Sequence, residues 1–499
     1  MTDAPARPVR VRFAPSPSGD LHVGNIRTAL YDWAFARHTG GTFVFRIEDT
    51  DRARVTDEYI AAAVETMRWL GLAWDEGPEV GGPHAPYLQS QRMELYAEWA
   101  RRFLDSGDAY RCYCSPEELD ERREAQRARG VTPGYDGHCR QLDPEQVRAY
   151  EAEGRRPVVR FRMPSGATTF PDLIRGEVTF EHDNVPDFVL ARADGTPLYT
   201  LAVTVDDVLM DITHIVRGED LLSSTPRQLA VYRAMGVKEE DFPVFAHLPF
   251  VMGQDNYKLS KRNGEVSVAW YRREGFLPEA ICNYLALLGW SPGGDRELFT
   301  LEEMSREFTL ERVNKNPARF DLKKLEAING DKIRGLPADD FVERIVPFLQ
   351  QAGLVAHDPA EGELEVVRQA APLVQERMAR LTESVGMLAF LLVDEAHFTV
   401  EPEAASRLLT AESRPVLAAA VPALERLRDG TTWAAVAIEA ALREAIVEGL
   451  GIKPKLAFGP VRVAVTGRRV SPPLFESLEL LGADRTLRRL TAAIDVIDG

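Results

Sequence analysis

The spacing of apolar and polar side chains predicts that strands and helices alternate at the start of the chain. Residues 9–13 alternate apolar and basic side chains, as a half-buried strand does, and Pro15 and Pro17 end that pattern. A helical pattern runs from about Ile26 to Gly40, and residues 43–47 show a second strand pattern. A strand–helix–strand order favours a parallel, doubly wound sheet, so we predict an α/β fold of the Rossmann type here.

The pattern changes between about residues 112 and 200. A charged helical stretch at residues 116–129 is followed by short strand-like runs at residues 158–163 and 177–181. We interpret this part as an α+β insertion into the first fold. The sheet pattern then resumes in three stretches, at residues 201–208, 211–216 and 243–250.

Strand patterns nearly vanish after Leu322. Helical patterns follow one another, at residues 338–351, 363–392, 416–428, 433–448 and 484–497. We therefore predict an all-helical C-terminal region, either a bundle or a solenoid.

The size and composition of the chain are those of an ordinary globular protein. Its 499 residues predict about three domains at roughly 150 residues each, and 45% hydrophobic residues suffice for a large core. The formal net charge of −17 argues against a protein that coats DNA or RNA through a general excess of Lys and Arg, but it leaves room for basic patches. One basic stretch is residues 451–499, with eight Lys and Arg against five Asp and Glu.

The sequence also predicts a cytoplasmic location. No run of about 18 apolar residues is present, and the first residues lack the apolar stretch of a signal peptide. Four cysteines are too few for a disulfide scaffold, which favours a reducing compartment.

The first candidate functional segment is PSPSGDLHVGN at residues 15–25, between the first strand and the first helix. A helix N-terminus offers unpaired N–H groups and a positive dipole end to a phosphate. Gly24 would let a base or ribose approach the backbone, and His22 could donate to phosphate oxygens. A turn with a capping Asp and a surface histidine would explain the same residues.

The second candidate segment is KLSKR at residues 258–262, which places three cations within five residues between Gly253 and Gly264. Such a basic loop can close on polyphosphate, although most short Lys/Arg runs are solvated turns. No GxxxxGK[ST] sequence is present, so a P-loop does not handle ATP here.

Two further candidates follow predicted strands. Glu48 lies among acidic residues after the second strand and could hold an ammonium group, although this segment could equally cap the next helix. Arg217, in the segment VRGED, could bind a carboxylate through two charged hydrogen bonds, or form a structural ion pair.

Together these segments resemble the class I aminoacyl-tRNA synthetases. HVGN at residues 22–25 resembles their HIGH signature, and KLSKR resembles their KMSKS signature. VRFAPSPSGDLHVGN, FRIEDTDR, YTLAVTVDD and IVRGED are similar to the glutamyl/glutaminyl branch, and within it to bacterial glutamyl-tRNA synthetases. The similarity continues through GFLPEAICNYLALLGWS and KLEAINGDKIR to GPVRVAVTGRRVSPPLFESLELLG, so it covers nearly the whole chain in the family's order.

The resemblance implies a reaction and its residues. Glutamate and ATP would form glutamyl-adenylate, and the terminal adenosine of tRNA-Glu would then accept the glutamate, with Mg²⁺ on the phosphates and tRNA needed for the first step. Catalytic roles fall on His22, Gly24, Lys258 and Lys261. The implied ATP-binding residues are His22, Gly24, Asn25, Asp220, Lys258, Ser260, Lys261 and Arg262. Those implied for glutamate are Arg12, Ser16, Glu48, Tyr199 and Arg217.

The resemblance also implies a monomer built from five segments. Residues 1–111 and 201–250 would be the two halves of the catalytic domain, and residues 112–200 an inserted domain for the tRNA acceptor end. Residues 251–325 would hold the KLSKR loop and a helical domain that contacts the tRNA stem, and residues 326–499 would bind the anticodon.

One departure from the family concerns zinc. Cys112, Cys114 and Cys139 resemble a zinc-binding arrangement of some bacterial relatives, but Gln141 replaces the histidine of those relatives. Glutamine is a poor zinc ligand, and His138 would need an awkward geometry as the neighbour of Cys139. We therefore expect no structural zinc and no other metal held by protein side chains.

Four alternatives share some of these features. A glutaminyl-tRNA synthetase has a similar catalytic half, but its anticodon region is made of β-barrels. A glutamyl-queuosine-type tRNA modifier would lack the C-terminal region. A non-catalytic tRNA-binding paralogue would be expected to lose the two ATP signatures, and a small-cofactor nucleotidyltransferase would have no use for a helical C-terminal third.

Overall fold

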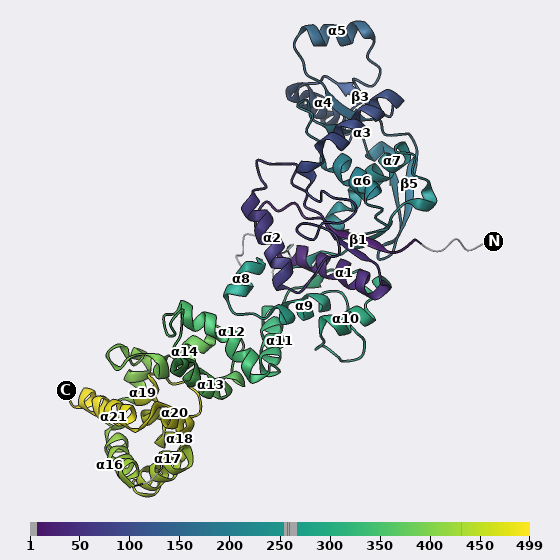
Figure 1. Cartoon of the computed structure of the whole chain (residues 1–499). Helices are drawn as coiled ribbons and strands as arrows, with labels where there is room; N and C mark the ends of the chain where they lie inside the picture. Colours follow the sequence, from purple (N-terminus) through teal and green to yellow (C-terminus); the bar gives the residue numbers. More distant parts are fainter. Residues whose placement is uncertain (1–6, 254–256, 258, 260–266, 431) are drawn as a thin grey trace. The chain divides into compact units, whose positions relative to one another are not determined.

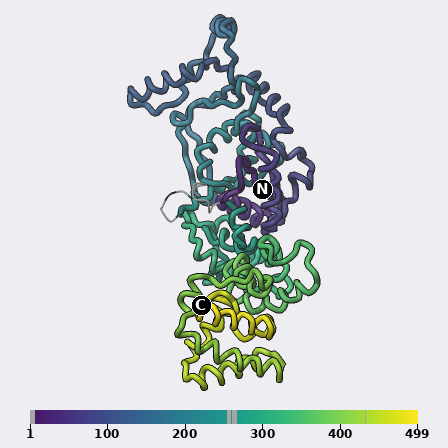
Figure 2. The backbone as a smooth tube through the Cα atoms, turned by 90° about the vertical axis from the view of Figure 1, so that its left-hand side faces the viewer, coloured from purple at the N-terminus to yellow at the C-terminus, as the bar shows by residue number. Residues whose placement is uncertain are grey.

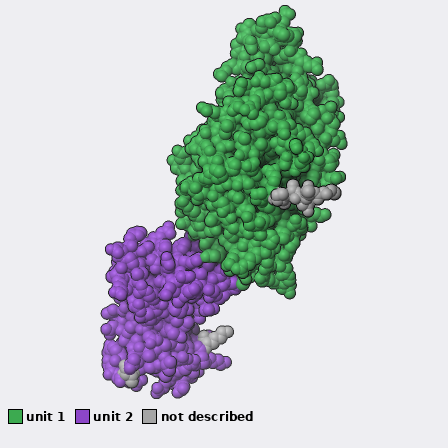
Figure 3. Space-filling model, turned by 45° about the vertical axis from the view of Figure 1, so that its right-hand side comes forward, with its two compact units in different colours: residues 1–272, 278–322 green, residues 273–277, 323–499 purple. Residues whose placement is uncertain are grey.

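The structure, a computed structural model of the whole chain, describes residues 7–253, Tyr257, Leu259, 267–430 and 432–499. The chain forms two compact units, shown in green and purple in Figure 3. Unit 1 contains residues 1–272 and 278–322, and unit 2 contains residues 273–277 and 323–499.

A six-stranded sheet forms the centre of unit 1 (Figure 1). Its order is β2 (Thr42–Phe45), β1 (Arg10–Phe13), β8 (His214–Gly218), β9 (Val244–Leu248), β5 (Ala167–Asp172) and β6 (Gly176–Glu181). The first five strands run parallel, and β6 returns antiparallel to β5 at the edge. The predicted α/β fold with a parallel sheet is therefore confirmed.

Buried apolar side chains from these strands pack together across the sheet. Val44, Phe170, Ile215 and Phe245 come from β2, β5, β8 and β9 and belong to one core cluster. Most residues of β1, β2, β8 and β9 are buried, as expected for a parallel sheet covered on both faces. The covering helices include α1 (Val23–Thr39), α6 (Tyr199–Leu209) and α7 (Thr225–Ala234).

The prediction of a strand at residues 201–208 is wrong, because this segment belongs to helix α6. The helix is buried on nearly all sides, including at its polar residues Thr204, Asp206 and Asp207. A short apolar run of this kind has the same pattern in a buried strand and in a buried helix, so periodicity could not separate the two.

The predicted insertion divides between two sheets. Strands β3 (Ala109–Cys112), β4 (Val158–Phe161) and β7 (Phe188–Ala191) form a separate antiparallel sheet. Helices α4 (Pro116–Ala128) and α5 (Pro144–Ala152) lie with it at one end of unit 1 (Figures 1 and 2). The hairpin β5–β6, by contrast, extends the large sheet, because β5 pairs in parallel with β9. Residues 112–200 are therefore not a single separate body.

Further helices surround these sheets in unit 1. They are α2 (Asp57–Trp69), α3 (Met93–Ser106), α8 (Val268–Arg273), α9 (Pro278–Leu287) and α10 (Leu301–Glu307). Two short strands, β10 (Val251–Met252) and β11 (Ala318–Arg319), pair in parallel.

Unit 2 contains helices and no strand within its described residues, which confirms the predicted all-helical C-terminal region. Its helices after α11 (Leu322–Arg334) are α12 (Ala338–Gln351), α13 (Glu361–Gln375), α14 (Glu383–Leu392), α15 (Pro402–Leu408), α16 (Arg414–Gly430), α17 (Ala435–Leu442), α18 (Pro454–Ala457), α19 (Gly459–Thr466), α20 (Leu474–Leu481) and α21 (Ala483–Asp498).

One predicted helix in unit 2 is in fact two. The pattern at residues 363–392 is broken between α13 and α14, where Asn329 donates to the carbonyl of Ala379 and the backbone N–H of Ala379 donates to Glu383. The first bond holds the connecting segment against α11, and the second joins it to the first residue of α14. None of the described helices has the length and apolar character needed to cross a membrane.

Candidate active site

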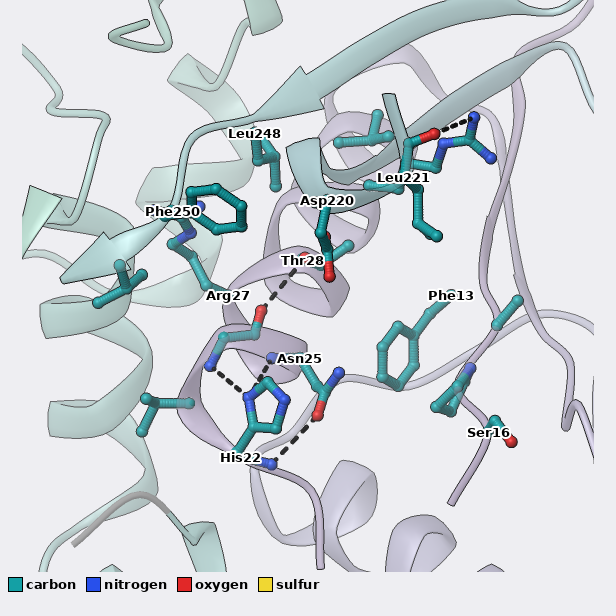
Figure 4. A pocket seen from close by; sticks show the side chains of 18 of the residues that line it. Phe13, Ser16, His22, Asn25, Arg27, Thr28, Asp220, Leu221, Leu248 and Phe250 are labelled. Atoms are coloured by element: carbon teal, nitrogen blue, oxygen red, sulfur yellow. Dashed lines mark hydrogen bonds between the residues drawn. The ribbon is translucent and has the colours of Figure 1, made fainter. Parts of the chain in front are cut away.

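One cavity of about 320 Å³ lies where the C-terminal ends of β1 and β8 and the segment after β2 meet the first residues of α1 and α6 (Figure 4). The carboxyl ends of parallel strands are where doubly wound folds build their sites. Each of the predicted site residues that the structure describes lines this cavity: Arg12, Ser16, His22, Gly24, Asn25, Glu48, Tyr199, Arg217 and Asp220. Lys258, Ser260, Lys261 and Arg262 lie outside the described residues, although Leu259 lines the cavity.

His22 caps the N-terminus of α1 at the cavity. Its Nδ1 accepts hydrogen bonds from the backbone N–H groups of Gly24 at 3.1 Å and Asn25 at 3.3 Å (Figure 4). The Asn25 side chain accepts the His22 backbone N–H in return, which completes a capping box. Because Nδ1 is the acceptor, the neutral imidazole carries its proton on Nε2.

Gly24 is held close to this histidine. A Cβ built at Gly24 would lie 3.1 Å from two atoms of the His22 ring. A side chain at this position would therefore crowd the imidazole that caps the helix, a reason for glycine that the sequence alone does not reveal.

A buried ionic network supports the next part of the cavity wall. Arg12 donates to Asp207 at 3.1 Å, and Arg46, fully buried beneath it, donates to Asp207 at 2.8 Å and to Glu48 at 3.1 Å. Burial raises the pKa of Glu48, and the charges of Arg46 and Arg12 oppose that rise. The pKa of Asp207 is lowered, because these two guanidinium groups outweigh the effect of its burial.

Arg217 lies deeper in the cavity and has a different environment. It is only 3% exposed, and its partners among the described residues are all neutral. Burial lowers its pKa, but an arginine keeps its charge in proteins. A buried cation without a described acidic partner fits an anionic group of a substrate. Its hydrogen-bond acceptors are His247 at 3.0 Å, the Tyr199 hydroxyl at 3.4 Å, the Leu221 carbonyl at 3.3 Å and the Thr225 hydroxyl at 2.9 Å.

Sequence reasoning missed two polar residues at this site. Arg27 lines the cavity from α1 and donates to the carbonyls of Leu288 and Pro249, so it anchors the segment that precedes the KLSKR loop. His247 lies in β9 directly beside Arg217. The only sequence signal for either residue was that a single polar side chain interrupts an apolar helix or strand pattern. Such an interruption is weak evidence for a functional residue when one sequence is considered.

The three cysteines of the insertion come together outside the cavity. The sulfur atoms of Cys112, Cys114 and Cys139 all lie within 4.8 Å of one another. The Tyr135 hydroxyl lies 3.4 Å from the Cys112 sulfur, which makes it a fourth donor atom that the sequence analysis did not consider. The three sulfur atoms supply three of the four ligands that structural zinc takes, and the Tyr135 oxygen, which also accepts the backbone N–H of Cys139, is a candidate for the fourth. Cys282 is buried in α9, as expected for a core residue.

Comparisons with known proteins cover nearly the whole chain. Residues 8–327 match the model of the catalytic domain of class I tRNA synthetases (E and Q), and residues 340–494 match an anticodon binding domain. Glutamate–tRNA ligases of Nocardioides sp. and Saccharopolyspora erythraea are 56% and 55% identical to the chain. These alignments span 97% and 98% of this chain and 98% and 97% of the relatives.

Solved structures show the same similarity. The crystal structure of a glutamate tRNA ligase from Elizabethkingia meningosepticum in complex with its amino acid superposes with a TM-score of 0.83 at 32% identity. The superposition covers 98% of this chain and 99% of the Elizabethkingia meningosepticum chain. The glutamate–tRNA synthetase from Elizabethkingia anophelis superposes with a TM-score of 0.82, also at 32% identity, over 98% of this chain and 100% of its own.

Proposed function

The chain belongs to the glutamate–tRNA ligases, a family of class I aminoacyl-tRNA synthetases, and from this premise we propose how its cavity works. The protein joins L-glutamate to tRNA at the expense of ATP. In our proposal glutamyl-adenylate is the intermediate, and the 3′-terminal adenosine of tRNA-Glu is the acceptor.

The charge of Arg217 is the observation that carries this proposal. Glutamate presents two carboxylates and one ammonium at neutral pH. We assign its side-chain carboxylate to Arg217, whose described partners are neutral, and its ammonium to Glu48. Arg12, Ser16 and Tyr199 complete the glutamate site. Glutamine would leave the buried guanidinium without an opposite charge, so the site rejects it.

The first chemical step needs positioning and charge stabilisation. An oxygen of the α-carboxylate attacks the α-phosphorus of ATP, and the bond to the bridging oxygen breaks as pyrophosphate leaves. The N-terminus of α1 and the Nε2–H of His22 stabilise the negative charge on the phosphate oxygens. In our proposal Asn25, Asp220, Lys258, Ser260 and Arg262 help to bind ATP, Lys261 stabilises the departing pyrophosphate, and Mg²⁺ neutralises the phosphates.

The second step transfers glutamate to tRNA. A ribose hydroxyl of the terminal adenosine attacks the activated carbonyl, and AMP leaves with its bonding electrons. We assign the acceptor end to residues 112–200, the stem to residues 251–325 and the anticodon to residues 326–499, with residues 1–111 and 201–250 as the catalytic domain. The enzyme acts as a cytoplasmic monomer and requires bound tRNA to activate glutamate.

Replacement of Arg217 tests this assignment. In ATP–pyrophosphate exchange with tRNA-Glu present, we expect Arg217→Ala to lower kcat/KM for glutamate by at least about 100-fold, because glutamate loses its cationic partner. The KM for ATP should stay within about 2-fold, since the ATP groups are assigned elsewhere. Arg37→Ala, which removes a half-buried arginine of α1 that pairs with Asp75 and does not line the cavity, is the control. A value of kcat/KM for glutamate near that of the wild type in Arg217→Ala would refute the assignment.

A further inference from the structure

A chain of hydrogen bonds across three parallel strands holds Arg217 on the side away from the cavity. Its Nε donates to Nε2 of His247 at 3.0 Å, and Nδ1 of His247 lies 2.6 Å from Oδ2 of Asp172. Arg217 and His247 are register partners on β8 and β9, and Asp172 is the last residue of β5, beside β9. Because the hairpin β5–β6 joins the large sheet, Asp172 becomes part of this chain of hydrogen bonds.

This chain of hydrogen bonds determines which atoms carry the protons. Arginine Nε is always a donor, so Nε2 of His247 must accept, and the single ring proton of a neutral histidine then lies on Nδ1. That proton is donated to Asp172, which also accepts the backbone N–H groups of Ile174 at 3.0 Å and Arg175 at 2.8 Å. These bonds lower the pKa of Asp172 despite its burial, and burial lowers the pKa of His247, so the aspartate is charged and the histidine neutral.

The same contacts orient the guanidinium group toward the substrate. Nε is held by His247, and one terminal nitrogen is held by the Thr225 hydroxyl at 2.9 Å. The other terminal nitrogen has only the 3.4 Å contact with the Tyr199 hydroxyl among the described residues. Arg217 and Tyr199 line the cavity, whereas His247 and Asp172 are buried outside its lining.

We propose that His247 and Asp172 are positioning residues that give the cavity its preference for glutamate over glutamine. This inference rests on the proposed function, because it assumes that Arg217 binds the side-chain carboxylate. A neutral histidine holds the guanidinium in place without neutralising it. A carboxylate in direct contact, such as Asp207 against Arg12, would supply the opposite charge that the substrate should bring.

Three substitutions separate this role from simple packing. His247→Ala removes the acceptor. In His247→Gln the amide oxygen can accept from Arg217 while the amide nitrogen donates to Asp172, so the chain is restored. In Asp172→Asn the backbone N–H groups of Ile174 and Arg175 keep the remaining oxygen, and the new amide donor faces His247. The histidine must then move its proton to Nε2, where it points at Arg217.

The control is His214→Gln, at the opposite end of β8. His214 is half-buried, contacts Phe35 and hydrogen-bonds to Thr213, and it does not line the cavity. This variant makes the same chemical change in a neighbouring strand, away from the chain of bonds.

The measurement is steady-state charging of tRNA-Glu with glutamate and with glutamine, together with the KM for ATP and the melting temperature of each variant. We expect His247→Ala and Asp172→Asn to raise the KM for glutamate about 10- to 100-fold and to lower the glutamate-to-glutamine ratio of kcat/KM. The KM for ATP should change less than about 2-fold, and His247→Gln should come within about 3-fold of the wild type on every value.

Two results would overturn the inference. The first is an unchanged KM for glutamate and an unchanged selectivity in both His247→Ala and Asp172→Asn. The second is a parallel loss of kcat, ATP affinity and melting temperature that His247→Gln does not rescue, which would mark a structural role. If His247→Ala does not fold, His247→Gln and Asp172→Asn carry the test. A wild-type protein that fails to charge glutamate would refute the proposed function itself.

Discussion

The buried arginines around the cavity differ in what balances their charge. Arg46 lies beside Asp207, Glu48 and Asp206, and Arg12 lies beside Asp207, so both are paired within the protein. Arg217 has neutral partners among the described residues. A buried charge without a counter-ion costs stability in the free protein. Binding of a carboxylate recovers that free energy, so the arrangement favours an anionic substrate over a neutral analogue.

The raised pKa of Glu48 predicts how glutamate binding depends on pH. Its carboxylate takes up a proton at a higher pH than an ordinary glutamate, because burial outweighs the charges of Arg46 and Arg12. The protonated form cannot hold the substrate ammonium, which keeps its own charge at acidic pH. The KM for glutamate should therefore rise as the pH falls toward the pKa of Glu48, which lies above that of an ordinary glutamate.

Kinetics with Glu48→Gln provide the comparison for this prediction. This variant should bind glutamate weakly at every pH and lose the pH dependence, because it has no carboxylate to protonate. A wild-type KM for glutamate that stays constant as the pH falls from neutrality toward the range in which the substrate's own side-chain carboxylate titrates would contradict the role assigned to Glu48.

Individual residues were predictable from sequence where a motif contained them. His22, Gly24, Glu48 and Arg217 stand in such motifs, and the structure places all four on one cavity. His247 was not predictable, because its importance depends on register partners far apart in the chain.

Among the secondary-structure elements, the hairpin β5–β6 shows why domain boundaries are difficult to predict. It lies within a stretch that looks like an insertion, yet it pairs with β9 in the large sheet. Long-range strand pairing leaves no local signal in the sequence. Helices were predicted more reliably, and the observed bounds of α12 agree with the pattern because its apolar stripe is regular and buried.

The contacts of one basic residue in helix α21 predict that it stabilises the fold of the C-terminal region. Arg489 is buried and donates to both carboxylate oxygens of Glu395, at 2.7 and 3.2 Å, and to the Val465 carbonyl at 2.7 Å. Its neighbour Arg488 is exposed. We expect Arg489→Ala to destabilise the protein by about 1–3 kcal/mol, because it leaves Glu395 with fewer partners. Arg488→Ala should cost less than about 0.5 kcal/mol.

Thermal unfolding of the full chain tests this pair of variants. A clearly lower melting temperature in Arg489→Ala than in Arg488→Ala is expected. Equal melting temperatures would show that the Arg489 contacts do not stabilise the helices they join.

The excess of basic residues in residues 451–499 does not by itself indicate an RNA-binding face. Like Arg489, Arg462 and Arg485 form hydrogen bonds with acceptors of the protein itself.

The cysteine cluster beside β3 leads to a prediction about zinc. From Gln141 and His138 we expected no structural zinc, but the structure brings three sulfur atoms within 4.8 Å of one another and places the Tyr135 hydroxyl beside Cys112. The structure therefore changes our expectation to about one zinc per chain in protein purified without chelator. Elemental analysis should find the metal in the wild type and in Cys282→Ser, and much less in Cys114→Ser. A zinc content below about 0.1 per chain would instead support the expectation from the sequence that no structural zinc binds.

At the scale of the whole molecule, the negative charge and the nucleic-acid partner are compatible. The excess of acidic residues accounts for a net charge of −17, while individual arginines supply positive charge at the cavity. The sequence predicted an α/β region followed by helices, and the structure has an α/β unit 1 and a unit 2, residues 273–277 and 323–499, whose described elements are all helices.

Charging of purified tRNA by the wild-type protein tests the central claim most directly. With ATP and Mg²⁺, the enzyme should attach glutamate to tRNA-Glu, and glutamine should be used at least about 100-fold less efficiently. The same assay with tRNA-Gln shows whether the enzyme distinguishes the two tRNAs. Glutamine attached as efficiently as glutamate, or no charging of tRNA-Glu with glutamate, would contradict the account.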